Sequence, residues 1–165
     1  MEKKIIYNCL KSLKQAGPPI VILAAVLEAE AIVSACRDNG IEVSAICDSV
    51  KKKSPDLFCG LEVIHTPTLP ERFPKARFIF AAQAIQDSVN QLSALGYDEF
   101  YSALEILENF NVNKHQYLKT SQSYMKARIL LYKKGHTAYF DEEKTYMRSV
   151  DVMVTTKCSM KCESC

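Results

Sequence analysis

Three cysteines carry the strongest chemical signal in this chain. Cys158, Cys162 and Cys165 are separated by three and by two residues. Thiolates at this spacing can wrap one face of an iron–sulfur cubane, and a [4Fe–4S] cluster normally takes four thiolates. Three protein ligands would leave one iron open to a small molecule. The spacing therefore predicts a [4Fe–4S] cluster with one open coordination site.

Two other interpretations of the cysteine triplet stay open. Structural zinc takes four ligands, commonly as paired Cys-x2-Cys knuckles. Residues 158–165 contain one such pair, and neither a second pair nor a Cys–His cluster lies near it in the sequence. Chance clustering is the other alternative. The remaining cysteines are scattered among apolar residues, and we expect Cys36 and Cys47 to be buried as small hydrophobic side chains.

The residues around the triplet resemble the cluster loop of the radical S-adenosylmethionine (SAM) superfamily. Residues 152–165 read VMVTTKCSMKCESC, which is an apolar strand pattern followed by a Thr-x-x-Cys-polar-apolar-basic-Cys-x-x-Cys loop. Thr155, Ser159, Met160 and Lys161 stand where the family has residues of these types. The flanking residues thus strengthen what the cysteine spacing alone suggests.

This resemblance implies an enzyme and its cofactors. Cys158, Cys162 and Cys165 would hold the [4Fe–4S] cluster, and SAM would bind the open iron for reductive cleavage to a 5′-deoxyadenosyl radical. A flavodoxin or a ferredoxin would supply the electron. Ser164 departs from the family, which often has an aromatic or apolar residue there, near the SAM adenine. Because the sequence stops at the third ligand, we expect the N-terminal part of a longer enzyme, inactive by itself.

Alternating strand and helix patterns predict an α/β fold, with a doubly wound, mainly parallel Rossmann-like sheet over residues 17–111. Short apolar runs predict its strands at 20–25, 41–47, 60–64, 76–82 and 99–101. The other predicted parts are an N-terminal helix in 1–16, a helical connector over 112–148, and the truncated start of the radical SAM domain at 149–165. That last part would be the first strand and cluster loop of a (β/α) partial barrel.

Local patterns make further predictions about the helices. An apolar periodicity predicts a helix over residues 3–15. Ser102 and Glu105 have the spacing of a capping box that begins a helix through about Phe110. In the connector, a helix is predicted over residues 121–132, ended by Gly135 and followed by a short strand at 137–140.

The histidines and tyrosines of the chain give weaker signals. His65, His115 and His136 stand singly in turns or polar stretches, and we expect them on the surface. We also expect Tyr124, Tyr132 and Tyr139 to pack the connector.

The first strand–helix turn of the predicted sheet lacks the glycine-rich fingerprint of dinucleotide-binding folds. Residues 24–29 read AAVLEA, and Glu28 would crowd and repel a phosphate. Asp48 stands where a ribose-binding carboxylate would stand, at the end of the next predicted strand. Its alternative is an ordinary turn residue. Likewise, the lysines at 51–53 could neutralise a phosphate or form a solvated loop.

Parts of this region resemble the small Rossmann-like domains of surface-polysaccharide and nucleotide-sugar enzymes. The likeness covers residues 41–48, the GLEV sequence at 60–63 and the QLSALGY sequence at 91–97. It implies a small-molecule ligand such as a sugar nucleotide. A ligand-binding or docking module without catalysis is therefore the alternative function.

Composition and charge narrow the remaining classes. Apolar residues make up 48% and charged residues 24% of the chain, as in soluble globular proteins. The net charge of +2 gives no reason to expect a nucleic-acid or membrane partner. No apolar run is long enough to span a bilayer, and the amino terminus lacks the features of a signal peptide. We therefore expect a cytoplasmic protein without a membrane span.

Overall fold

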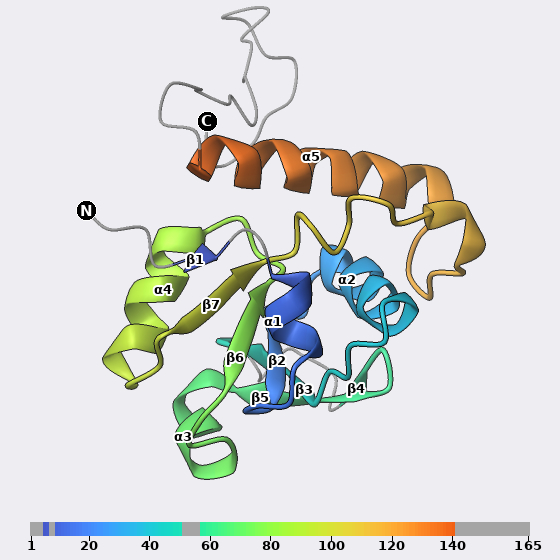
Figure 1. Cartoon of the computed structure of the whole chain (residues 1–165). Helices are drawn as coiled ribbons and strands as arrows, with labels where there is room; N and C mark the ends of the chain where they lie inside the picture. The colour runs from blue at the N-terminus through green and yellow to red at the C-terminus, as the bar shows by residue number, and fades with distance from the viewer. Residues whose placement is uncertain (1–4, 7–8, 51–56, 141–165) are drawn as a thin grey trace, which may run out of the picture.

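The apolar runs of the sequence form one sheet in the computed structural model, which describes residues 5–6, 9–50 and 57–140 (Figure 1). The strands are β1 (Ile5–Ile6), β2 (Ile20–Leu23), β3 (Ala45–Asp48), β4 (Leu57–Phe58), β5 (Leu61–His65), β6 (Arg77–Phe80) and β7 (Glu99–Ser102). Their order is β1-β7-β6-β2-β3-β5-β4. All neighbours pair in parallel except β4 and β5. The predicted α/β class and mostly parallel sheet are confirmed.

Helices cover both faces of the sheet. One buried cluster includes residues of α1 (Leu10–Lys14), α2 (Leu27–Asp38) and α5 (Gln122–Phe140), and the other includes residues of α3 (Leu69–Arg72) and α4 (Ile85–Ala94). Two 3-10 turns, η2 (Thr66–Thr68) and η3 (Val112–Lys114), complete the elements of the described residues. Along β2, Ile20 and Ile22 face the first cluster, while Val21 and Leu23 face the second. Burial on both faces explains the continuous apolar runs.

The strand order reverses between β2 and β6. From β2 the chain moves to β3 and β5 on one side, then returns to β6 and β7 on the other. In open α/β sheets, ligands bind outside the carboxyl ends of the strands at such a reversal. The carboxyl ends of β2 and β6, which we call the switch point, are therefore the first place to examine for a site.

The predicted helix over residues 3–15 is wrong in its first half. Residues 5–6 form the edge strand β1, which pairs in parallel with β7. The helix α1 begins only at Leu10, where the Glu105 carboxylate accepts the backbone N–H groups of Cys9 and Leu10. The partners of this amino-terminal segment are β7 and Glu105, and both lie far along the chain from it. A local periodicity therefore does not reveal them.

The predicted helix from Ser102 to Phe110 is also wrong, because residues 103–109 form turns. The Ser102 hydroxyl accepts the Leu104 N–H at 3.3 Å. Glu105 directs its carboxylate to the start of α1 instead of back to Ser102. A long-range partner therefore overrides the local capping pattern.

The second and third predicted strands differ from the structure in detail. β3 begins at Ala45, so the strand predicted from Ile41 is shorter than expected. The antiparallel hairpin of β4 and β5 was not predicted. Its two turn residues, Cys59 and Gly60, have φ values of 54° and 77°. Two successive positive φ values are typical of a type I′ hairpin turn, which usually has Asn or Asp in the place of Cys59.

α5 is longer than predicted. It continues through Gly135 to Phe140, so Gly135 does not end it and residues 137–140 are helical instead of a strand. Met125 and Tyr132 of α5 lie in the same buried cluster as α1 and α2. The division of the chain at residue 111 stays a prediction, although α5 shares this core. Residues 141–165, with the predicted last strand and the cysteine triplet, lie outside the described residues.

Candidate functional site

α5 crosses the carboxyl ends of β6 and β7 (Figure 1). The Tyr132 hydroxyl donates to the Phe80 carbonyl oxygen at 2.6 Å and accepts the Ala103 N–H at 3.0 Å. Both groups are the last polar backbone groups of their strands or follow directly after them. Burial raises the pKa of Tyr132, so its hydroxyl stays protonated. One buried side chain of α5 thus closes the sheet edge on one side of the switch point.

His136 lies one helical turn beyond Tyr132 and stacks on its ring, with the ring centroids 3.9 Å apart. Its Nε2 is 3.1 Å from the Ala82 carbonyl oxygen and its Nδ1 is 3.1 Å from Ser102 Oγ. A carbonyl only accepts, so Nε2 carries the proton and Nδ1 accepts the Ser102 hydroxyl. Burial lowers the pKa of His136 to about 4, and the Ala82 hydrogen bond opposes this in part. The imidazole is therefore neutral at pH 7.

A serine hydroxyl that donates to a neutral histidine has the arrangement of a nucleophile and its general base. Here Ser102 and His136 are both 0% exposed, so no substrate carbonyl can approach the hydroxyl. The pair acts as a buried polar contact that holds α5 to the sheet. The expectation that His136 lies on the surface is wrong, because this residue sits on the buried face of a helix and not in a turn.

Asp48 stands at the carboxyl end of β3, as predicted. Its Oδ2 accepts the Ala25 N–H at 2.8 Å, and its Oδ1 accepts the Val50 N–H at 2.7 Å. Ala25 belongs to the turn between β2 and α2, and the preceding Ala24 has a φ of 83°. The Asp48 carboxylate thus occupies a backbone donor of the turn that would face a phosphate in a dinucleotide site. A ribose-binding role of Asp48 stays a prediction.

Two buried glutamates occupy the first turns of α2, beside the switch point. Glu28 pairs with Arg128 of α5 at 2.6 Å, and Glu30 accepts the Leu118 N–H at 2.6 Å. The second oxygen of each carboxylate is buried without a hydrogen-bond partner among the described residues. A phosphate at this helix terminus would meet fixed negative charge. The expectation that Glu28 repels a phosphate stays a prediction, since its carboxylate is paired with Arg128.

A pocket of about 420 Å³ remains beside the closed edge. It lies between the first turn of α4 and the carboxyl-terminal half of α5, and its lining includes Gln83, Gly135, Ala138 and Tyr139. Asp87 is the one carboxylate in the lining. A single carboxylate without a second acid, base or metal ligand beside it does not make a metal site or an acid–base pair.

The cysteines of the described part of the chain do not form a metal centre. Cys9, Cys36 and Cys47 are buried, and Cys59 is half-buried. The predicted burial of Cys36 and Cys47 is thus confirmed. Burial raises the pKa of Cys36 and of Cys59 to about 12, so both are thiols at pH 7. Within residues 5–6, 9–50 and 57–140, no three potential metal ligands gather, and the triplet Cys158, Cys162 and Cys165 lies outside these residues.

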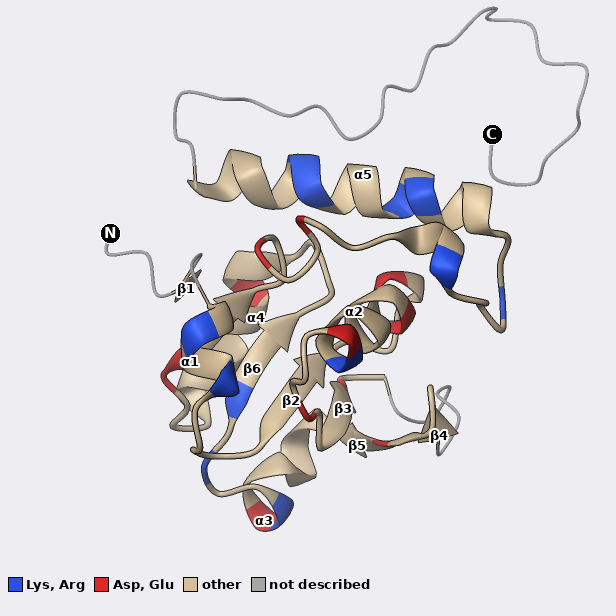
Figure 2. Cartoon of the chain, turned by 45° about the vertical axis from the view of Figure 1, so that its right-hand side comes forward, with Lys and Arg blue, Asp and Glu red and all other residues tan. Residues whose placement is uncertain are grey.

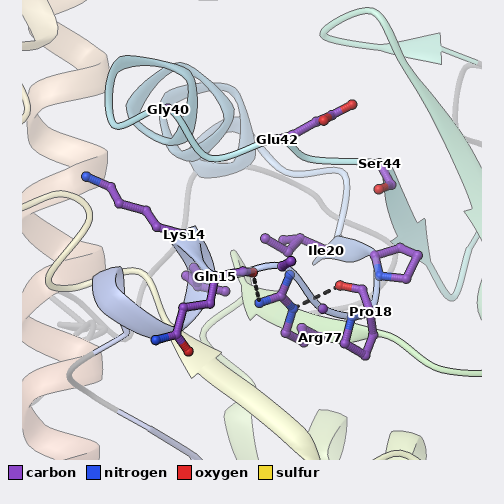
Figure 3. A pocket seen from close by; sticks show the side chains of 12 residues that line it. Lys14, Gln15, Pro18, Ile20, Gly40, Glu42, Ser44 and Arg77 are labelled. Atoms are coloured by element: carbon purple, nitrogen blue, oxygen red, sulfur yellow. Dashed lines mark hydrogen bonds between the residues drawn. The ribbon is translucent and has the colours of Figure 1, made fainter.

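Another pocket, with a volume of about 530 Å³, lies at the opposite, amino edge of the sheet (Figure 3). Arg77, the first residue of β6, projects into its floor. Its Nε donates to the Pro18 carbonyl oxygen at 2.9 Å, and its Nη1 donates to the Ser12 and Gln15 carbonyl oxygens at 2.8 and 3.2 Å. These bonds fasten the end of α1 to the start of the sheet. Arg77 is thus a structural clamp in this pocket.

The sequence did not reveal that Tyr132 and His136 lie against the carboxyl ends of the strands. Their spacing of four residues on a helix was the available signal, since it puts both side chains on one helix face. His65 and His115 are partly exposed, as expected, and His115 pairs with Asp38 at 2.8 Å. What the sequence lacked was any sign that α5 packs across the sheet edge.

Comparison of the chain with protein-family models, with curated proteins and with solved structures found no match. In the described part of the chain, no helix combines the length and the apolar character needed to cross a membrane.

Proposed function

We propose that residues 149–165 open the cluster-binding domain of a radical SAM enzyme, and that a doubly wound Rossmann-like domain precedes it. The observation that carries this proposal is the triplet Cys158-x3-Cys162-x2-Cys165 directly after the apolar pattern of residues 150–154. In this proposal, the pattern is the first strand of a (β/α) partial barrel, and the triplet forms its cluster loop. A reducing compartment such as the cytoplasm would keep the thiols free for iron.

The donor set fits the proposed cofactors. Three thiolates suit a [4Fe–4S] cluster in which one iron keeps an open position. When bound there, the cluster and SAM would supply reductive cleavage of SAM, with an electron from a flavodoxin or ferredoxin. The protein's own part is to provide Cys158, Cys162 and Cys165 as ligands and to orient the cofactors. The substrate stays open.

The state of the other cysteines supports this choice of ligands. Iron–sulfur clusters bind thiolates, and thiolate formation needs an exposed or electropositive setting. Burial instead raises the pKa of Cys9 and Cys36 to about 12 and that of Cys47 to about 11. At pH 7 these three cysteines are therefore buried thiols, which do not suit the binding of iron.

The test is anaerobic reconstitution of the full-length protein with iron and sulfide. We expect visible absorption from a [4Fe–4S] cluster and, after reduction, an EPR signal that changes when SAM is added. Cys158→Ala, Cys162→Ala and Cys165→Ala should each abolish cluster assembly. Cys59→Ala is the matched control, because Cys59 is the most accessible cysteine of the described residues and lies outside the triplet.

Three results would contradict the assignment. Normal iron content in all three triplet variants would remove these cysteines as ligands. Stoichiometric zinc without iron would favour the zinc site. A cluster whose EPR signal does not respond to SAM would exclude the radical SAM reaction while keeping the cluster.

A second candidate function is a docking module without catalysis in the α/β domain. The observation that favours docking over nucleotide binding is the closed switch point, with Tyr132 and His136 against the strand ends and Glu28 at the start of α2. Isothermal titration with a uridine diphosphate sugar should then give no binding heat. Binding that is lost in Asp48→Asn would instead support the sugar-nucleotide ligand and the ribose role of Asp48.

A further inference from the structure

α5 and the residues that lead into it carry an unusual charge distribution. Residues 109–140 contain six Lys and Arg residues and no Asp or Glu, whereas residues 1–108 contain eleven basic and fourteen acidic residues. Lys and Arg positions recur along α5, whereas Asp and Glu positions lie on α2, α3 and α4 and in several loops, one of them just beneath α5 (Figure 2). Arg128 is paired with Glu28. The exposed lysines of α5 therefore create a positive face on an otherwise slightly acidic domain.

A groove of about 470 Å³ lies on this positive face, between α5 and residues 108–113. We call it the α5 groove. Ile129 and Val112 line it and are 6% and 7% exposed, so they form an apolar floor. Lys126 and Lys133 line the same groove from α5, seven residues apart. Residues seven apart lie on one helix face, so the two ammonium groups flank the floor from the same side.

Leu130 lies between the two lysines on this face and also lines the groove. Its side chain is 54% exposed, which is unusual for a large apolar residue that adjoins a buried floor. Its neighbours Ile129 and Val112 continue the apolar surface inward. The α5 groove thus offers contact area for one apolar side chain between two positive charges.

The wall opposite α5 is rich in amides. Asn109, Asn111 and Asn113 are exposed and line the groove at alternating positions. Asn111 Oδ1 accepts the Asn113 N–H at 3.1 Å, which fixes the direction of that side chain. Amide side chains both donate and accept, so they can bond to the N–H and C=O groups of an extended peptide. The remaining polar lining residue of this wall is the exposed Glu108.

We propose that the α5 groove binds an acidic segment of a partner protein that inserts one apolar side chain beside Leu130. Lys126 and Lys133 would pair with carboxylates on either side of that residue, and the asparagines would bond to its backbone. The amide-lined wall favours a peptide, because amide side chains can bond to the N–H and C=O groups of an extended backbone. This proposal is independent of the cluster and of SAM.

The test is fluorescence anisotropy of the full chain with a short labelled peptide in which Asp and Glu surround a central leucine. The same peptide with Asn and Gln in place of the acids is the control ligand. We expect binding of the acidic peptide alone, weakening as salt increases. The double variant Lys126→Glu/Lys133→Glu should weaken binding at least about tenfold, and Leu130→Ser by about threefold.

Lys134→Glu is the matched control, because Lys134 is an exposed lysine of the same helix that does not line the groove. It should change the affinity by less than about twofold. Glu108→Gln should strengthen binding, because it removes the one acidic lining residue. Equal losses in Lys134→Glu and in the double variant would overturn the proposal, since they would indicate a general charge effect.

Other occupants give distinct results that would also overturn it. Binding to phosphatidylserine vesicles without binding to the peptide would identify a lipid surface. A dimer in sedimentation that dissociates in Lys126→Glu/Lys133→Glu would identify a second copy of this chain. No anisotropy change with the acidic peptide would exclude the groove as a peptide site.

Discussion

The two edges of the sheet are closed by opposite chemistry. At the carboxyl edge, two neutral and fully buried rings, Tyr132 and His136, contact backbone carbonyls and the Ser102 hydroxyl. At the amino edge, the charged guanidinium of Arg77 binds three backbone carbonyls on the floor of an open pocket. The Tyr132–His136 contact is dry and uncharged, whereas the Arg77 contact is charged and lies next to an open pocket.

This difference has consequences for stability. When a group at the dry edge is removed, its partners are left without water, so they lose their hydrogen bonds outright. At the open edge, water can replace a lost donor in part. We therefore expect larger effects from changes at the carboxyl edge, and a pH dependence that originates there.

The largest effect should come from Tyr132→Ala. This change removes a fully buried ring and leaves the Phe80 carbonyl and the Ala103 N–H unpaired. We expect the free energy of unfolding to fall by about 4 kcal/mol, measured by urea denaturation. Tyr132→Phe keeps the ring and should cost about 1–2 kcal/mol. Equal, small losses in both variants would show that α5 does not close this edge.

The next effect is a dependence of stability on pH. Burial lowers the pKa of His136 from 6.5 to about 4. Above pH 6.5 the histidine is neutral in both states, and its full contribution is present. As the pH falls from 6.5 to 4, the unfolded chain takes up a proton that the folded chain refuses. The free energy of unfolding should therefore fall by up to about 3 kcal/mol over this range.

His136→Gln isolates this contribution, because glutamine does not titrate. We expect its stability to be lower at pH 7 but flatter between pH 6.5 and 4 than that of the unchanged protein. Carboxylates titrate in both proteins and cancel in the difference. Identical slopes in the two proteins would mean that His136 is accessible to solvent when folded.

At the amino edge, Arg77→Met should have a smaller effect. Methionine keeps much of the aliphatic stem and removes the donors to the Ser12, Gln15 and Pro18 carbonyls. Because the pocket admits water, we expect a loss of about 2 kcal/mol in urea denaturation. Lys75→Met is the matched control on an exposed residue close by in the chain, and should change stability little. A loss as large as that of Tyr132→Ala would mean that the two edges do not differ.

The sequence predicted the parts of the fold that depend on local apolar patterns. β2 and β6 follow from the continuous apolar runs at residues 20–25 and 76–82. The sequence misassigned β1 and the segment after Ser102, because each depends on a partner distant in the chain. Glu105 illustrates this, since its carboxylate stabilises α1 instead of its own segment.

At the candidate site, the sequence predicted the position of one residue, Asp48, but not those of Tyr132 and His136. Asp48 lies at the strand end where the alternation of elements placed it, because parallel strands end at a common edge. Tyr132 and His136 could not be assigned to that edge, because helical spacing gives a buried face but not what covers it. The cysteine triplet is a sequence observation and stays a prediction.

The smallest changes in the free energy of unfolding are expected from alanine substitutions at two glycines, one near each edge of the sheet. A Cβ at Gly135 would lie 3.7 Å from the Gln83 side chain, an ordinary contact. Since alanine favours a helix interior over glycine, Gly135→Ala should raise the free energy of unfolding by about 0.5–1 kcal/mol. A loss instead would return Gly135 to the helix end that the sequence indicated.

At Gly17, a Cβ would lie 3.2 Å from Arg77 Cζ, close enough to displace the guanidinium. Gly17→Ala should therefore lower the free energy of unfolding by about 1 kcal/mol, measured as a shift in thermal midpoint. In the Arg77→Met background this loss should shrink, because the guanidinium that the methyl group would displace is gone. An unchanged loss in that background would mean that Gly17 acts through its own backbone and not through the Arg77 clamp.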